Sequence, residues 1–408
     1  MLRRGLVVLG RLLFTLLCIQ LYSRPAQADD LSVIQVTDVH IEYTFDVQLN
    51  MNVTFASEIP IIEAALFLAQ DEQPEIGIGP KRVDSDGKAV FTHDLIQHPL
   101  RPFSIVLYWF AVTLQNGEHH FTPKYQFFYQ DNRFDWQTIE GDIFRVHWYQ
   151  GDVISAQEVL SVAQKGRRRA QDLLSQDLTG MVDIYVYDDP QALQAALRLT
   201  AQKWVAGQAY PDVGVILVSL PDGPEKNLEM ERQIPHELMH LMLYQKTAPD
   251  YVNLPLWLTE GLASVNEIYP NPDYQIILED AYQHERLLPL SSLCRSFPNE
   301  TAEALLAYAE AASFVRFLQI HYGSSGLEKL VLEYTATNHC EQGIEHALGA
   351  SLTQMESRWK REVFSKQTRL NRTESLIPWL VLLMVVLAAP LILSILLLRQ
   401  KITKPVGG

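Results

Sequence analysis

The residues best suited to catalysis lie in one short stretch, Ile234–Gln245, which carries the pattern His-Glu-x-x-His. Residues four apart lie on the same face of a helix, so His236 and His240 can present two imidazoles to one Zn²⁺ ion. Glu237 lies one step round the helix, where it can take a proton from a metal-bound water. The sequence therefore predicts a metal-binding helix with its own general base. The alternative is a helix whose histidines are ordinary polar side chains.

A third metal ligand is expected from the segment that follows. Glu260 lies in the run Trp257–Ala263, and nineteen residues separate it from His240. The apolar spacing predicts a second helix over Leu256–Ile268. No Lys or Arg occurs between positions 254 and 266, so a metal must neutralise this glutamate if it is buried. The alternative is an exposed glutamate near a helix start. We expect the two histidines and Glu260 to bind one Zn²⁺.

The elements that must position these residues lie within residues 133–368, the predicted catalytic module. A capping-box pattern that begins at Ser155 predicts a helix to about Leu174, with Arg167–Arg169 on a solvated face near its end. The periodicity is mostly helical from Thr301 onward. Strands are expected at Ile143–Trp148, Val182–Tyr187, Trp204–Tyr210 and Val215–Leu220. The metal-binding helix thus follows directly on a small sheet.

The stretch His236–Ala263 resembles the gluzincin metallopeptidases, in the family often called peptidase MA-like. The similar features are the His-Glu-x-x-His helix and the run Trp-Leu-Thr-Glu-Gly-Leu-Ala at positions 257–263. The nineteen residues between His240 and Glu260 are similar to the thermolysin spacing. The likeness extends over about Phe134–Phe364. It implies a thermolysin-like α+β zinc metallopeptidase module that hydrolyses peptide bonds in peptide or protein substrates.

The resemblance also implies roles for individual residues. His236, His240 and Glu260 would hold the zinc, and Glu237 would be the general base. Such enzymes often stabilise the oxyanion with a tyrosine or histidine. The first candidate here is Tyr308 and the second is His321, although Tyr308 on a helix also suits a core aromatic.

Two features of the sequence depart from the pattern of related enzymes. A thermolysin-like aspartate that orients a metal ligand would fall four residues after Glu260, where this chain has Ser264. The Gly-Ala-Met-Glu-Asn motif of typical aminopeptidases does not occur in the sequence. The strand Trp204–Tyr210 is a candidate edge for pairing with an extended peptide.

Residues 29–132 form a strand-rich module without a catalytic constellation. Ile41–Val47 alternates between apolar and polar residues, as expected for a half-buried strand. The turn pairs Asp86-Gly87 and Asn116-Gly117 lie between apolar runs, as in β-hairpins. About seven strands over this length predict an Ig-like or fibronectin-like β-sandwich with a spacer or binding role.

The two ends of the sequence predict export and membrane anchoring. Residues 1–28 have a basic start, an apolar run and an Ala-Gln-Ala cleavage pattern, which together indicate a signal peptide. Residues 376–398 are uncharged and long enough for a transmembrane helix, after a link at 369–375 and before a basic tail at 399–408. We expect a single-pass cell-membrane protein with a cytoplasmic tail and an extracytoplasmic catalytic domain. An uncleaved N-terminal anchor is the alternative for the first segment.

The net charge and the cysteines of the chain bear on its binding partners and on a possible disulfide. The net charge is −15, and the ends carry seven of the 33 basic residues and none of the 48 acidic ones. A body this acidic excludes nucleic acid as a partner, because phosphates would be repelled. Cys294 and Cys340 are the cysteines outside the predicted signal peptide. An oxidising compartment permits a disulfide between them, and we expect one, with two free thiols as the alternative.

The sequence as a whole predicts a membrane-anchored extracytoplasmic zinc peptidase. One alternative is a catalytically silent binding or adhesion protein that keeps the metallopeptidase fold. Another is an enzyme that acts on a non-peptide ligand at the same site. Glu237 argues against the silent protein, because a scaffold has no chemical need for a general base at that position.

Overall fold

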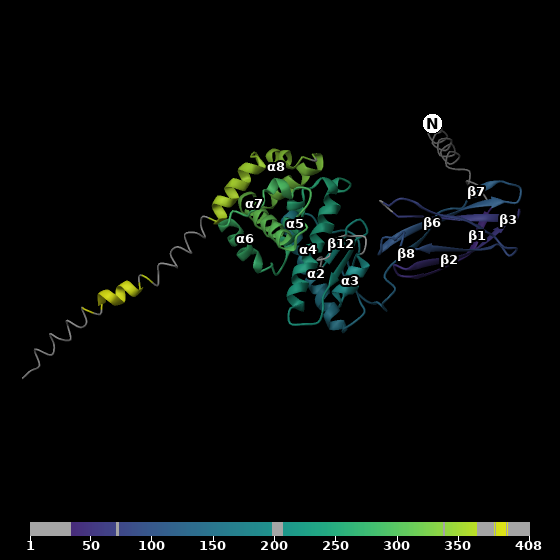
Figure 1. Ribbon diagram of the computed structural model, residues 1–408, viewed down its shortest axis with the longest axis horizontal. Helices are drawn as coiled ribbons and strands as arrows, with labels where there is room; N and C mark the ends of the chain where they lie inside the picture. The colour runs from purple at the N-terminus through teal and green to yellow at the C-terminus, as the bar shows by residue number, and fades with distance from the viewer. Residues whose placement is uncertain are drawn as a thin grey trace, which may run out of the picture. The chain divides into compact units, whose positions relative to one another are not determined.

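The computed structural model describes residues 34–70, 73–197, 207–337 and 339–364, and further along the chain residues 379, 381–388 and 390. The chain divides into two compact units between Arg133 and Phe134. Figure 1 shows a strand-rich first unit and a second unit in which a sheet is followed by helices. The expected mixed α+β architecture is confirmed, with β-sheets first and a helical region after them.

The first unit contains two antiparallel sheets. One has the strand order β1-β2-β5, and the other has the order β4-β3-β6-β7 with β8 also paired to β6. The rings of Phe55 and Phe91 on the first sheet lie 5.1 and 5.6 Å from that of Phe110 on the second, so the two sheets share a core. The strands are β1 Ile34–Thr44, β2 Gln48–Ser57, β3 Ile61–Ala69, β4 Ile76–Arg82, β5 Lys88–Asp94, β6 Ser104–Leu114, β7 His119–Phe121 and β8 Tyr125–Tyr129.

The second unit opens with a five-stranded sheet in the order β12-β13-β11-β10-β9. Its three central strands run parallel, while β9 and β12 pair antiparallel at the two edges. Alternate residues such as Val146, Ile184 and Ile216 are fully buried and belong to the main core. The strands are β9 Gln137–Gly141, β10 Phe144–Trp148, β11 Val182–Tyr187, β12 Gly207–Tyr210 and β13 Val215–Ser219.

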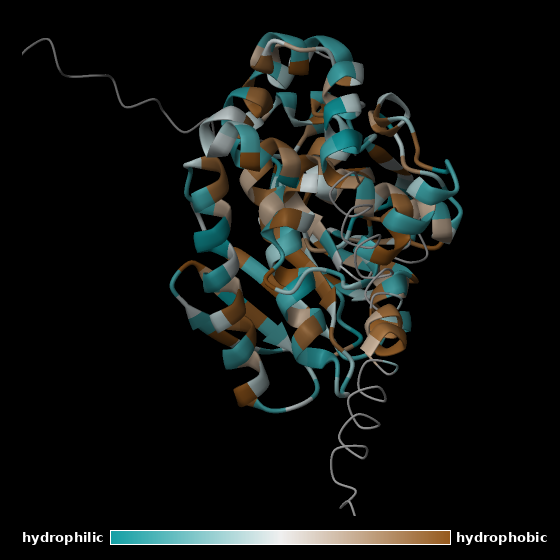
Figure 2. Ribbon diagram, turned by 90° about the vertical axis from the view of Figure 1, so that its left-hand side faces the viewer, coloured by the Kyte–Doolittle hydropathy of each residue, from teal (hydrophilic) through white to brown (hydrophobic). Residues whose placement is uncertain are grey.

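The helices of the second unit pack on this sheet and on one another. In Figure 2 hydrophobic and hydrophilic positions alternate along them, as expected for helices with one buried face. The long helix α7 is kinked at Gly323, and the segment 352–364 is also helical. The elements are α2 Val153–Leu174, α3 Pro190–Ala196, α4 Lys226–Thr247, η1 Asp250–Asn253, α5 Leu256–Asn266, α6 Asp273–Gln283, η2 Leu290–Leu293, α7 Thr301–Ala336 and α8 Cys340–Leu348.

The predicted start of the first helix is wrong by a few residues. Helix α2 begins at Val153, and its cap is Asp152, whose side chain accepts a hydrogen bond from the backbone N–H of Ser155 at 3.0 Å. Ser155 therefore lies inside the first turn and is not the cap. Aspartate and serine are equally suited to this position, so the sequence pattern alone does not distinguish them.

Helix α5 is packed tightly against α7, which places Glu260 beside α4. Gly261 makes this approach possible: a Cβ at that position would lie 2.5 Å from Val315 Cγ2 and 2.6 Å from the carbonyl oxygen of Ala311. Farther along, a disulfide joins Cys294 to Cys340 across a Cα–Cα distance of 6.1 Å. It links the segment after η2 to the start of α8.

Within the described residues, none of the helices combines the length and the hydropathy that a membrane span requires. Of the predicted span 376–398, residues 379, 381–388 and 390 are helical and the others lie outside the described residues. The predicted signal peptide 1–28, the link 369–375 and the tail 399–408 also lie outside them.

Candidate metal centre

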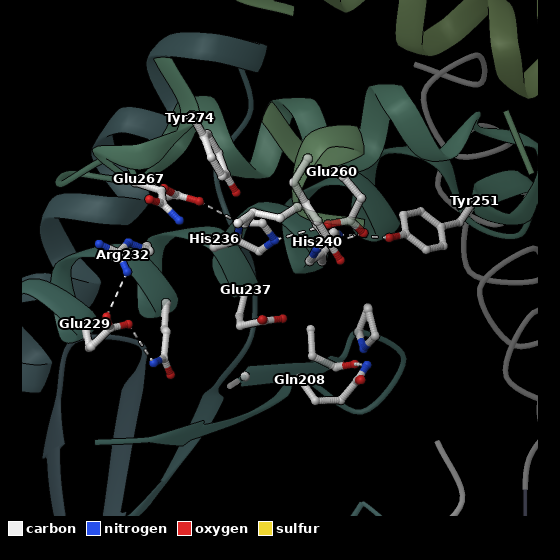
Figure 3. A pocket seen from close by; sticks show the side chains of 17 residues that line it. Gln208, Glu229, Arg232, His236, Glu237, His240, Tyr251, Glu260, Glu267 and Tyr274 are labelled. Atoms are coloured by element: carbon white, nitrogen blue, oxygen red, sulfur yellow. Dashed lines mark hydrogen bonds and ion pairs between the residues drawn. The ribbon is translucent and has the colours of Figure 1, made fainter. Parts of the chain in front are cut away.

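Two helices bring the three predicted metal ligands together. His236 and His240 lie on α4 and Glu260 lies on α5, and one ligand atom from each falls within 4.8 Å of the others. Oε2 of Glu260 is 3.2 Å from Nε2 of His236, and Oε1 is 3.7 Å from Nε2 of His240 (Figure 3). Two imidazoles and a carboxylate form a donor set that suits Zn²⁺ with one position left open. The residues present therefore fit a zinc ion.

The second ring nitrogen of each imidazole, Nδ1, also has a partner. Nδ1 of His236 lies 3.1 Å from Oε1 of Glu267, and Nδ1 of His240 lies 3.3 Å from the hydroxyl of Tyr251. Such contacts fix the ring orientation and the tautomer, so that Nε2 stays available for a metal. Figure 3 shows Glu267 and Tyr251 approaching the two histidines from opposite sides.

Glu267 is a residue that sequence reasoning missed. The sequence has Ser264 where a thermolysin-like enzyme would carry an orienting aspartate, and Ser264 is buried inside α5. Helix α5 ends at Asn266, and the extended backbone of Glu267 (ψ 132°) follows it. Glu267 is seven residues after Glu260, hence two helical turns on, and this spacing was the available signal. Tyr251, in the short 3₁₀ helix η1, gave no comparable signal.

Glu237 lies next to the candidate ligands and is almost fully buried, with 8% of its surface exposed. Burial raises its pKa to about 7, although a hydrogen bond from the backbone N–H of Ala209 works in the opposite direction. A carboxyl group with a pKa near neutrality can both take and return a proton. A divalent cation on the neighbouring ligands would lower this pKa again.

Burial also acts on the candidate ligands themselves. It lowers the pKa of His240 to about 4, which favours the neutral imidazole that a metal requires. Burial opposes the charge of His236 as well, but the hydrogen bonds to Glu260 and Glu267 outweigh it and raise its pKa. Burial would raise the pKa of Glu260, but the neighbouring histidines hold it below its usual value. Glu260 thus keeps its negative charge at the point where a cation would bind.

The candidate ligands open onto a cavity of about 530 Å³. Its lining includes Tyr308 from α7, the predicted oxyanion residue, together with Tyr251 and Tyr274, which the sequence did not single out. The Tyr308 ring packs edge-on against Phe297 at 5.0 Å. The second candidate, His321, is not part of the lining; it pairs with Glu362 at 2.8 Å. Of the two predicted oxyanion residues, only Tyr308 reaches the site.

Strand β12 forms one wall of the cavity and is an edge strand among the described residues. Of the predicted strand Trp204–Tyr210, residues 204–206 lie outside the described residues. Figure 3 shows Glu237 between the histidines and the strand that carries Gln208. Gly207 permits this arrangement, because a Cβ there would lie 2.8 Å from Oε1 of Glu237 and 3.2 Å from its Cγ. The edge strand therefore holds the general-base candidate in place.

Comparison with known proteins gives a family and a number of similar structures. The model of the peptidase MA superfamily matches residues 162–365, half of the chain. No curated protein matches the sequence.

A mutant M1 zinc metallopeptidase from Deinococcus radiodurans, bound to a Tyr-Ser-Ala substrate, is 13% identical with a TM-score of 0.36. That match covers 80% of this chain and 94% of the other. Yeast LTA4 hydrolase in complex with bestatin is 11% identical with a TM-score of 0.38, over 83% of this chain and 69% of the other. On the match of the family model, the chain belongs to the peptidase MA superfamily.

Proposed function

We propose that this protein is a zinc-dependent peptidase of the gluzincin type, with a thermolysin-like catalytic module. The observation that carries the proposal is the meeting of His236, His240 and Glu260 beside the buried carboxyl of Glu237 at one cavity. A metal-binding scaffold without catalysis needs the first three residues only. Membership of the peptidase MA superfamily agrees with this proposal.

In the proposed mechanism His236, His240 and Glu260 hold the zinc. When bound, zinc supplies a Lewis acid that polarises the scissile carbonyl and makes a water acidic enough to attack near neutral pH. Glu237 takes the proton of the attacking water and gives it to the leaving amine. The backbone N–H of Ala209 and the absence of a side chain at Gly207 keep that carboxyl in position. Burial of the site strengthens these electrostatic interactions.

The direct test combines a metal measurement with a screen for cleavage. The full-length chain is expected to bind one zinc ion. It should cleave members of a broad peptide library when zinc is present and leave them intact when a chelator is added. Mass spectrometry of the products would identify the bond cleaved. Zinc binding without cleavage of any peptide would instead favour a silent binding protein or an enzyme with a non-peptide substrate.

Tyr308 is proposed to donate a hydrogen bond to the oxyanion that forms on the substrate. Tyr308→Phe is expected to lower kcat by about 10²-fold, the usual cost of losing one such donor, with little change in zinc content. Tyr322→Phe on the same helix is the matched control, because its hydroxyl contacts Met355 Sδ outside the cavity lining. Equal kcat values for Tyr308→Phe and the wild type would exclude this role.

Gly207 provides a second test of the proposed base. Gly207→Ala is expected to displace the Glu237 carboxylate and to lower kcat by about 10²-fold, while zinc binding persists because no ligand is touched. Gly223→Ala is the control, since a Cβ there meets nothing within 4 Å. Steady-state kinetics and metal analysis on the same preparations check both expectations.

We also propose that the protein is exported and anchored in the cell membrane through residues 376–398, with its catalytic unit outside the cytoplasm. The support is the pattern of basic and apolar residues at 1–28 and 376–404, together with the Cys294–Cys340 disulfide, which an oxidising compartment favours. Protease added to intact cells should degrade the catalytic unit, and extraction of the protein should require detergent. Recovery of protected, freely soluble protein would refute the proposal.

A further inference from the structure

Of the three consecutive arginines on α2, Arg168 and Arg169 are exposed, as the sequence predicts, and Arg167 is partly buried. Arg167 pairs with both carboxylate oxygens of Asp177 at 2.6 Å and with Asp142 at 2.6 Å. Arg168 is exposed, and its side chain makes no hydrogen bond or ion pair within the part of the chain that the structure describes. Arg169 reaches across to the end of α5. The three residues therefore have different surroundings, although their chemistry is identical.

Arg169 donates hydrogen bonds to three successive carbonyl oxygens. These belong to Val265 at 3.1 Å, Asn266 at 2.9 Å and Glu267 at 3.0 Å. The last carbonyls of a helix have no partners within it, so they need donors from elsewhere. A guanidinium group is suited to this task because its donors form a rigid fork. Arg169 thus caps α5 at the point where the chain turns into Glu267.

The same turn is tied to the metal-binding helix through Pro235. Proline has no N–H, so the carbonyl of Glu231, four residues earlier, has no helical partner. It accepts instead from the backbone N–H of Ile268 at 2.9 Å. The side chain of Asn266 donates to the carbonyl of Pro235 at 2.7 Å. The residues on both sides of Glu267 are therefore fixed to the turn of α4 that precedes His236.

We propose that Arg169 is a positioning residue for the metal centre, acting through Glu267 on His236. The inference rests on the proposed zinc site. Arg169 does not line the cavity and is 97 residues away from Asn266 in sequence, so its influence must pass through the backbone of the turn. Without the guanidinium group of Arg169, the carbonyls of residues 265–267 lose their donor, and the turn at the end of α5 shifts. Glu267 then no longer holds the imidazole of His236 at its 3.1 Å contact.

The test measures zinc affinity by competition with a chromophoric chelator on the full-length chain. Glu267→Gln is expected to weaken zinc binding by about 10–100-fold, the usual cost of losing such an orienting partner. Arg169→Gln should weaken it by roughly 10-fold. Arg168→Gln removes the same charge from the neighbouring position and should leave the affinity unchanged. Circular dichroism confirms that each variant folds.

A double-mutant cycle separates positioning from a general loss of structure. If Arg169 acts through Glu267, the double variant should bind zinc no more weakly than Glu267→Gln alone. Additive losses would overturn the inference, and so would wild-type affinity in Arg169→Gln. Should that variant fail to fold, Arg169→Lys, which keeps the charge but lacks the fork, replaces it in the same cycle. Absence of zinc binding in the wild type would refute the proposed function itself.

Discussion

Replacing Glu237 with glutamine is expected to lower peptide turnover by about 10²–10⁴-fold while one zinc ion stays bound. Glutamine keeps the size of the side chain but cannot take a proton from water. The effect should be large because Glu237 is a buried carboxyl that lines the cavity beside the ligands without being one of them. Measurement of kcat and of zinc content on the same preparation checks both parts of this expectation.

The matched control is Glu231→Gln, the same chemical change on the same helix. The side chain of Glu231 does not line the cavity, and its backbone carbonyl, which binds Ile268, is unaffected by the substitution. This variant should keep wild-type turnover. A Glu237→Gln protein that binds zinc and cleaves peptides at the wild-type rate would contradict the assigned role.

Replacing His240 with alanine is expected to remove the zinc and with it all peptidase activity. Only His236 and Glu260 would remain, and each protein ligand contributes about 10²–10³-fold to affinity. Zinc should therefore no longer raise the Tm of this variant, whereas it should raise that of the wild type. Metal analysis after dialysis and a thermal melt with added zinc provide the measurements.

The comparison variant is His321→Ala, which removes a histidine that pairs with Glu362 away from the cavity lining. It should bind zinc as the wild type does. Stoichiometric zinc in His240→Ala would refute the ligand assignment, whatever the activity of that variant. The two replacements in the metal helix thus separate metal binding, which needs His240, from proton transfer, which needs Glu237.

Much of the candidate site follows from local periodicity. His236, Glu237 and His240 are close because they are neighbours on one helix, and α4 covers the predicted stretch. The four strands predicted before that helix also correspond to described strands, since alternation of apolar residues is a local pattern. The helix of Glu260 was predicted for the same reason, from its own apolar spacing.

What surrounds the site depends on contacts between residues far apart in sequence. Glu267 meets His236 across 31 residues, and Arg169 meets the end of α5 across 96 to 98. No pattern within a single helix or strand encodes such contacts. Position 264, where a thermolysin-like enzyme would carry an orienting aspartate, is Ser264 inside α5 in this chain, and the carboxylate that meets His236 comes from Glu267, just after the helix ends at Asn266.

The sequence by itself determined the residue types and spacing of the candidate metal ligands and the general base, because both are properties of one helical turn and one later helix. Only the tertiary structure decided which other residues position the candidate ligands and the general base. The absence of a side chain at Gly207 leaves room for the Glu237 carboxyl beside the edge strand. Tyr251 contacts His240, and Glu267 contacts His236. Helix packing and chain reversal bring these groups together, and both depend on the whole core rather than on neighbouring residues.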